Sequence, residues 1–156
     1  MITARGVSPV CPYQHEFKNT YLFGAFSPLN GHSFILDLPE CNTDMFQLFL
    51  NEFSSQEPDQ LKIVFLDNGA FHKAARLVIP DNIVLIFLPP YSPELNPAEL
   101  VWKFLKDKLA NQVFKTLKDL ANVIDHIVTK FLTSDRIITL TSYTAFVRPF
   151  QTIYEL

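Results

Sequence analysis

Four prolines fall within nine residues, at Pro89, Pro90, Pro93 and Pro97, between an apolar run and a helical pattern. Proline fixes its own φ and restricts the residue before it, so few conformations are open to this segment. The sequence therefore predicts a stiff loop that turns the chain sharply from a strand into a helix. In any fold of the chain, this loop limits how the strand and the helix are oriented relative to each other.

The segments before the proline loop predict two strands separated by a short helix. The apolar runs at 61–66 and 82–88 do not alternate with polar residues, so both strands are expected to be buried on two faces, as in a parallel sheet. Between them, "AFHKAARLVI" at 70–79 predicts a short helix that Pro80 ends. This order is typical of α/β proteins.

The helix after the loop has a clear start signal. Asn96 is the expected N-cap, Pro97 takes the first helical position, and Glu99 follows three residues after the cap as the partner in a capping box. A further helix is expected at about 117–131. The segment 136–156 is rich in β-forming residues and has no assigned place in the predicted fold.

The first third of the chain predicts a hairpin and a helix. Two β-rich runs at 20–27 and 33–38 flank an Asn30-Gly31 turn signal, and "NTDMFQLFLNEF" at 42–53 has apolar residues at helical spacing. We find no repeat or linker, so the 156 residues are expected to form a single α/β domain.

Charge and hydropathy narrow the classes of function. A net charge of −3 argues against a freestanding nucleic-acid binder, and the longest apolar run is six residues, against the ~20 of a membrane span. Without a membrane segment or a signal peptide, a cytoplasmic protein is expected. Five lysines lie within sixteen residues and form either a solvated helix face or a contact with DNA phosphates: Lys103, Lys106, Lys108, Lys115 and Lys118.

Two acidic residues stand where α/β proteins place their sites. Asp67 ends the first buried strand. Glu99 lies in the first turn of the helix that follows the second buried strand. Two converging carboxylates suit Mg²⁺, which prefers oxygen ligands. Asp67 could instead cap the following helix, and Glu99 could complete the capping box and pair with Lys103. The spacing alone leaves both interpretations open.

The segment 67–106 resembles the catalytic core of insertion-sequence transposases of the mariner superfamily. The family motifs are a strand ending in Asp-Asn, a His a few residues later, Leu-Pro-Pro-Tyr-Ser-Pro-x-Leu-Asn-Pro-x-Glu, and a Trp three residues on. Each motif position is filled in this chain, by Asp67, Asn68, His72, 88–93, 95–97, Glu99 and Trp102. More weakly, 21–53 resembles the hairpin and helix that precede this core.

The resemblance implies a ribonuclease H-like mixed sheet with flanking helices. It also implies an Asp/Asp/Glu site that binds two Mg²⁺ or Mn²⁺ ions for DNA cleavage and strand joining in DNA transposition. Asp67 matches the second carboxylate and Glu99 the third, with 31 residues between them. Glu94 is a competing acid, but it lies inside the proline loop before the helix.

The family's first carboxylate lies on the first, central strand of the sheet, upstream of the hairpin, and a helix-turn-helix region precedes it. The start of this chain resembles the segment just after that strand. The chain is therefore expected to be the C-terminal part of a DDE catalytic domain, with a core at about 18–132 and no central strand. Asp37 and Asp44 are expected to have structural roles instead.

The remaining motif residues have supporting roles by resemblance. Asn68 and His72 are expected to support Asp67, and Trp102 to brace the catalytic helix. Contacts with DNA are expected from four residues: Tyr91, Ser92, Lys103 and Lys106.

Two functions stay open. The chain is a strand-cleaving enzyme if an upstream-encoded transposase segment or a partner transposase supplies the missing part. Otherwise it is a non-catalytic remnant, inert or inhibiting full-length transposase.

Overall fold

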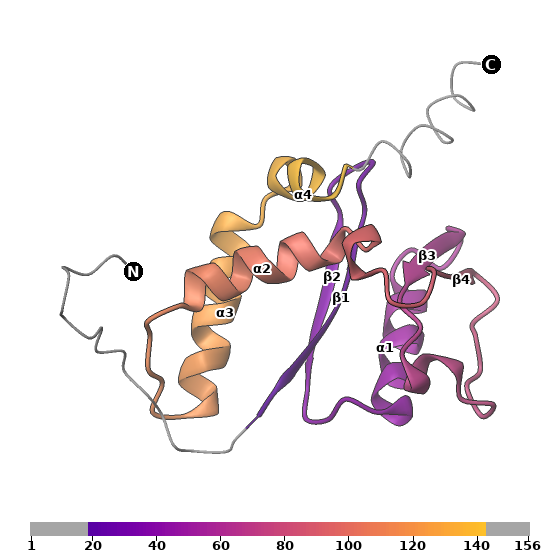
Figure 1. The fold of residues 1–156 in the computed structure, drawn as a ribbon, viewed down its shortest axis with the longest axis horizontal. Coiled ribbons are helices and arrows are strands. Elements are labelled where there is room, and N and C mark those ends of the chain that lie inside the picture. Colours follow the sequence, from indigo (N-terminus) through magenta and orange to yellow (C-terminus); the bar gives the residue numbers. More distant parts are fainter. Residues whose placement is uncertain (1–18, 143–156) are drawn as a thin grey trace.

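A computed structural model describes residues 19–142 of the chain (Figure 1). Strands and helices mix along it, and the predicted hairpin, the two later strands and the three longest helices are all present. In chain order the elements are β1 (Tyr21–Phe26), β2 (Ser33–Leu38), α1 (Thr43–Ser55), β3 (Lys62–Leu66), η1 (Ala70–Lys73), β4 (Ile83–Phe87), η2 (Pro93–Leu95), α2 (Ala98–Leu109), α3 (Leu117–Phe131) and α4 (Ser134–Thr141).

β1 and β2 form the predicted antiparallel hairpin, with Tyr21 opposite Leu38 and Phe26 opposite Ser33. The turn requires glycine at Gly31, whose φ is +70°. A Cβ atom there would also lie 2.3 Å from the backbone oxygen of Ser134, at the start of α4. The hairpin turn is therefore held against α4 at close range.

β3 and β4 form a second, parallel pair, with Lys62 beside Ile83 and Leu66 beside Phe87. Within residues 19–142 the two pairs are separate two-stranded sheets, and β1 does not pair with β3.

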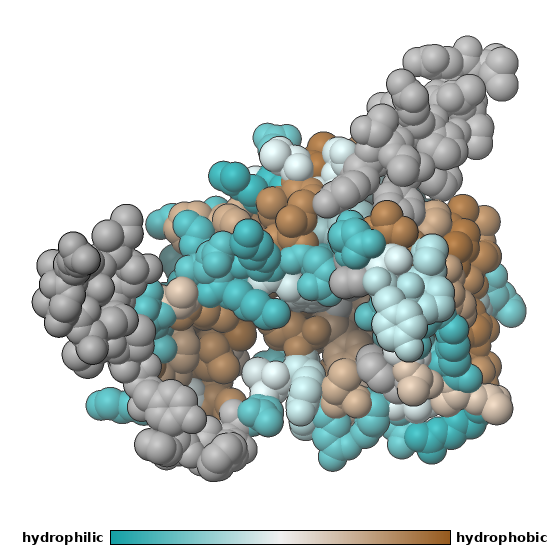
Figure 2. All heavy atoms as spheres, in the orientation of Figure 1, coloured by the Kyte–Doolittle hydropathy of each residue, from teal (hydrophilic) through white to brown (hydrophobic). Residues whose placement is uncertain are grey.

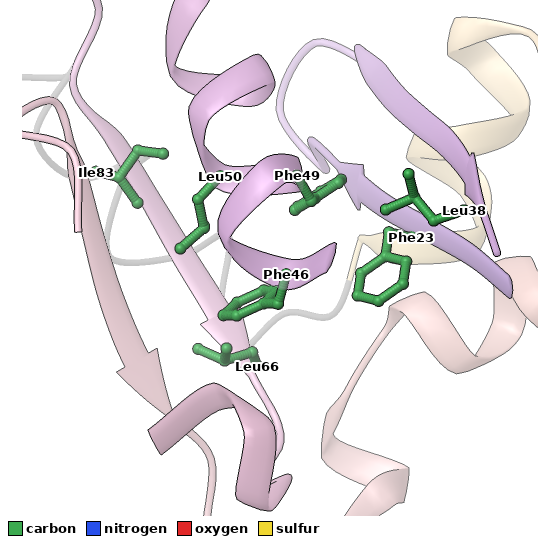
Figure 3. Close-up of a cluster of buried hydrophobic side chains, with 7 residues drawn as sticks. All are labelled: Phe23, Leu38, Phe46, Phe49, Leu50, Leu66 and Ile83. Atoms are coloured by element: carbon green, nitrogen blue, oxygen red, sulfur yellow. The ribbon is translucent and has the colours of Figure 1, made fainter. Parts of the chain in front are cut away.

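One helix joins the two sheets. The side chain of Asn42 caps α1 by accepting a hydrogen bond from the Met45 N–H. Figure 3 shows side chains of α1, among them Phe46 and Leu50, between β3–β4 on one side and the hairpin on the other. The Phe23 ring of β1 lies 6.5 Å from that of Phe46. α1 thus provides the apolar surface on which both sheets rest.

The other three helices cover the opposite face of the hairpin. A second apolar cluster centres on Val101 of α2 and Ile137 of α4, and Phe26 and Ile35 of the hairpin pack against it. The hairpin is therefore the middle layer between α1 and the helices that follow the proline loop. None of the described helices has both the length and the hydrophobicity needed to span a bilayer.

The predicted helix at 70–79 is wrong beyond its first turn. Only η1 is helical, because Ala74 turns to an extended conformation with ψ of 132°. The amide of Gln47 then donates to the Val78 carbonyl and accepts from the Val78 N–H, both at 2.7 Å. These bonds fix the segment after η1 against α1 in place of helical hydrogen bonds.

The segment 136–156, which is rich in β-forming residues and had no assigned place in the predicted fold, is helical as far as Thr141. Residues up to Thr141 form α4, and the side chain of its N-cap, Thr133, accepts a hydrogen bond from the Arg136 N–H. The cap and the contact of Ile137 with α2 outweigh the β-propensity of this stretch. Residues 143–156 lie outside the described part of the chain.

Burial of β3 and β4 on both faces is another expectation that fails within the described residues. Ile63, Val84 and Ile86 are 42%, 43% and 40% exposed. Only the side chains that alternate with them pack against α1.

Candidate active site

Asp67 follows the last residue of β3, and its carboxylate is open to solvent, with 61% of the side chain exposed. Its Oδ1 accepts the Gly69 N–H at 3.0 Å, which forms a tight local turn. Gly69, not Asp67, occupies the N-cap of η1, and no side chain caps that helix. The capping role considered for Asp67 is therefore wrong.

His72 lies beside Asp67, with Nε2 3.3 Å from Oδ1. Its ring meets the Phe46 ring edge-on at 4.3 Å, and its side chain is largely buried. Burial lowers the pKa of His72, although the attraction of Asp67 partly opposes this shift. A neutral imidazole that donates from Nε2 can thus hold one orientation of the Asp67 carboxylate.

The absence of a side chain at Gly69 allows His72 and Asp67 to approach each other closely. A Cβ atom at Gly69 would lie 2.7 Å from Cδ2 of His72 and 3.2 Å from Oδ1 of Asp67. Any larger side chain would push the imidazole from the carboxylate. The "DNG" sequence therefore fits the space at the end of β3.

Asn68 and Lys73 join the ends of the two parallel strands. The Asn68 amide donates to the carbonyl of Leu88, just after β4, and the Lys73 ammonium donates to Asn68 Oδ1. The same ammonium lies 4.9 Å from the centre of the Phe87 ring. Lys73 was not among the predicted site residues, although a cation directly after the expected His72 was a usable signal.

Glu99 is exposed in the first turn of α2. The predicted capping box does not form around it. Asn96 Oδ1 accepts the Ala98 N–H at 3.1 Å, one residue before the position that a capping box requires, and Pro97 is the N-cap. The Glu99 N–H donates to the Asn96 carbonyl at 3.1 Å.

Trp102 packs one turn further along α2, against the hairpin. Its ring meets the Phe26 ring edge-on at 5.2 Å. At Gly24 a Cβ atom would lie 2.6 Å from the Trp102 ring, so β1 and α2 approach closely only because position 24 is glycine. This contact fixes the position of α2 relative to β1, and with it the position of Glu99.

The proline loop presents an exposed aromatic side chain. Tyr91 is fully exposed and has a φ of +58°, a conformation uncommon outside glycine. The hydroxyl of Ser92 donates to the Pro90 carbonyl at 3.3 Å. Lys103 and Lys106 are exposed on α2 beyond the loop.

The donors present fit part of a divalent-metal site. Asp67 and Glu99 supply carboxylate oxygens, the ligand type that Mg²⁺ and Mn²⁺ prefer. Within residues 19–142, however, no three His, Cys, Asp or Glu side chains gather closely enough to hold a metal ion. Asp44, one of the other acids considered, pairs instead with Arg76 at 3.0 Å.

Comparisons with known proteins agree with the resemblance seen in the motifs. A family model described as DDE superfamily endonuclease matches residues 2–121. The uncharacterized protein y4pE/y4sA of Sinorhizobium fredii (strain NBRC 101917 / NGR234) is 43% identical over 102 residues, which cover 64% of this chain and 76% of that protein.

The fold is similar to that of a solved transposase. The structure of the Mos1 transposase paired-end complex with left transposon end superposes with a TM-score of 0.66 at 17% identity, over 90% of this chain. This chain spans 45% of the length of that neighbour. The likeness confirms the predicted ribonuclease H-like fold class, and the family match covers most of the sequence, so the chain belongs to the DDE superfamily endonucleases.

Proposed function

We propose that this chain supplies two of the three metal-binding carboxylates, Asp67 and Glu99, of a transposase catalytic site that cleaves and joins DNA strands. The arrangement at the end of β3 carries the proposal. Asp67 is solvent-open, yet its Oδ1 is bound by both Gly69 and His72. A carboxylate held in this way by neighbours in its own loop is typical of a ligand kept ready for a cation.

The chain's own residues contribute binding and orientation. Asp67 and Glu99 would hold a pair of Mg²⁺ or Mn²⁺ ions, which when bound activate the attacking oxygen and stabilise the leaving oxygen of a phosphodiester. His72 keeps Asp67 in one rotamer, and Asn68 fixes the end of β3 to that of β4. Trp102 holds the helix that carries Glu99.

Contact with DNA is assigned to the proline loop and α2. Tyr91 is fully exposed on a stiff loop, so its ring can stack on a base with little loss of conformational entropy. The ammonium groups of Lys103 and Lys106 are available for phosphates, and the Ser92 hydroxyl can donate to another phosphate oxygen once it releases the Pro90 carbonyl. The Mos1 neighbour was solved as a complex with a transposon end, which supports DNA as the partner.

The remaining carboxylate is proposed to come from a strand that enters between β1 and β3. Those strands belong to separate sheets in the described residues but rest on the same helix, α1. An upstream-encoded transposase segment or a partner transposase chain would supply that strand. The chain alone would then bind metal weakly and leave DNA uncut, in the cytoplasm of a cell that carries the element.

Nicking of a supercoiled plasmid in Mg²⁺ or Mn²⁺ tests this function. The chain is assayed alone and after co-expression with the segment that the DNA directly upstream encodes. Nicking is expected only from the co-expressed pair, with loss in Asp67→Asn and in Glu99→Gln but not in Asp81→Asn, an exposed acid before β4. Nicking that survives both substitutions would refute the assignment. A pair that assembles and never nicks DNA would favour the inhibitory remnant.

A further inference from the structure

The β3–β4 sheet has one face against α1 and an opposite face that is entirely apolar. Because side chains alternate along a strand, the residues that do not face α1 share one surface. Ile63 lies beside Val84, and Phe65 beside Ile86, while Leu61 continues the alternation just before β3. We call these five residues the outer face.

Four of the five side chains of the outer face are exposed in the described structure. Leu61 is 62% exposed, and Ile63, Val84 and Ile86 are each at least 40% exposed. Figure 2 shows hydrophobic side chains gathered on the side of the molecule where Figure 1 places β3 and β4. The hairpin, in contrast, is covered on both faces, by α1 and by the cluster around Val101.

An open apolar face is unusual for parallel strands, which are normally covered on both sides. A contiguous apolar surface in a soluble protein commonly marks a place where another segment or chain packs. The continuous apolar runs of β3 and β4 also indicate that both faces are covered. In a strand with one permanently solvated face, apolar residues would alternate with polar ones. The outer face therefore requires an occupant.

We propose that the last 14 residues of this chain, 143–156, cover the outer face. Their composition is complementary to it, since only Arg148 and Glu155 are charged. Eight of the 14 are apolar or aromatic: Tyr143, Ala145, Phe146, Val147, Phe150, Ile153, Tyr154 and Leu156. This density of large apolar side chains exceeds what a solvated terminus needs.

Chain length permits the contact. Fourteen extended residues reach up to about 46 Å, whereas a domain of this size has a radius of gyration of about 14 Å. The segment begins directly after Ser142, whose hydroxyl donates to the Pro28 carbonyl at the hairpin turn. Even wound as a helix it would be about 21 Å long, more than the ~17 Å of a five-residue strand. The alternative apolar occupant is a second copy of the chain.

Photo-crosslinking of the full chain distinguishes these occupants. Val84→benzoylphenylalanine places a photoreactive group on the outer face, and Val113→benzoylphenylalanine places it at an exposed site between α2 and α3. Light and heavy isotopic chains are mixed, irradiated and mapped by mass spectrometry. The proposal predicts crosslinks from position 84 to residues 143–156 of the same isotopic chain, and none to that segment from position 113.

Crosslinks between light and heavy chains, crosslinks to any other segment, or no peptide crosslink from position 84 would overturn the proposal. Because the photoreactive group is larger than valine, a near-isosteric substitution gives a second measurement. Val84→Thr should speed amide hydrogen exchange at least threefold in 143–156, and Val113→Thr should leave it unchanged. Equal exchange in Val84→Thr and the original chain would also overturn the proposal.

Discussion

Nε2 of His72 lies 3.3 Å from Oδ1 of Asp67, while the same imidazole rests edge-on against the Phe46 ring of α1. One side chain thus links the solvent-open end of β3 to the apolar cluster beneath both sheets. The position of Asp67 is consequently set by the core and not by the loop alone.

The substitution His72→Leu should distinguish the packing of His72 against Phe46 from its role in orienting the Asp67 carboxylate. Leucine retains the apolar contact with Phe46 but removes the hydrogen-bond donor to Asp67. We expect a folded protein whose Mn²⁺ affinity, measured by calorimetry, is about tenfold lower, since residues that orient metal ligands commonly have effects of this size. His126→Leu, on the exposed side of α3, is the matched control. An unchanged affinity in His72→Leu would show that the contact has no orienting role.

Gly24→Ala should displace α2. The added methyl group would lie 2.6 Å from the Trp102 ring and 2.9 Å from the Phe26 ring, so the helix must shift or the strand must bend. We expect a loss of about 1–3 kcal/mol in unfolding free energy, as in other overpacked cores. Trp102 is the only tryptophan in the chain, so its emission reports the shift directly.

A smaller ring should relieve this clash. Trp102→Phe in the Gly24→Ala background is expected to cost less than the sum of the two single substitutions. If the losses of unfolding free energy were additive, residues 24 and 102 would not be in steric conflict.

Lys62→Met should destabilise the end of α1. The buried Lys62 ammonium donates to the Glu57 carbonyl at 2.9 Å and lies 3.5 Å from the carbonyls of Ser54 and Gln60. Methionine fills the space but leaves these carbonyls without their donor, at a cost of about 1–3 kcal/mol in chemical denaturation. Lys115→Met, on an exposed site before α3, should change stability by less than about 0.5 kcal/mol. Equal costs at both positions would contradict this role for Lys62.

Asp37→Asn should change how stability depends on pH. Partial burial raises the pKa of Asp37 in the folded protein above its usual value. The folded state therefore holds this proton more tightly, and the associated stability is lost as the pH rises through the folded pKa. Relative to Asp37→Asn, the original chain should lose unfolding free energy as the pH rises above the usual aspartate pKa of about 3.9. Parallel pH profiles for the two proteins would refute the shift.

Local signals accounted for most of the fold. The Asn30-Gly31 turn and the helical spacing over 42–53 each act within a few residues, so the sequence alone predicts the elements they control. The helix predicted at 70–79 failed because its competitor is distant: Gln47, 31 positions before Val78, provides the hydrogen bonds that hold the segment extended. Such a contact leaves no mark in the local pattern.

The candidate residues at the end of β3 were found from the sequence for the same reason. Asp67 and its neighbours Asn68 and His72 lie in one short motif, which the family resemblance identifies. Lys73 was missed because its role depends on the Phe87 ring of another strand. The one-sided covering of β3 and β4 was also missed, since an apolar strand does not indicate which segment covers it.

Paramagnetic broadening by Mn²⁺ tests most directly whether Asp67 and Glu99 hold metal ions together. In amide NMR spectra of the full chain, substoichiometric Mn²⁺ should broaden signals around 67–69 and around 98–100 at the same metal concentration. Asp67→Asn should abolish both effects, as should Glu99→Gln, while Asp81→Asn should preserve both. Broadening confined to one segment, or broadening around 98–100 that persists in Asp67→Asn, would contradict a shared site.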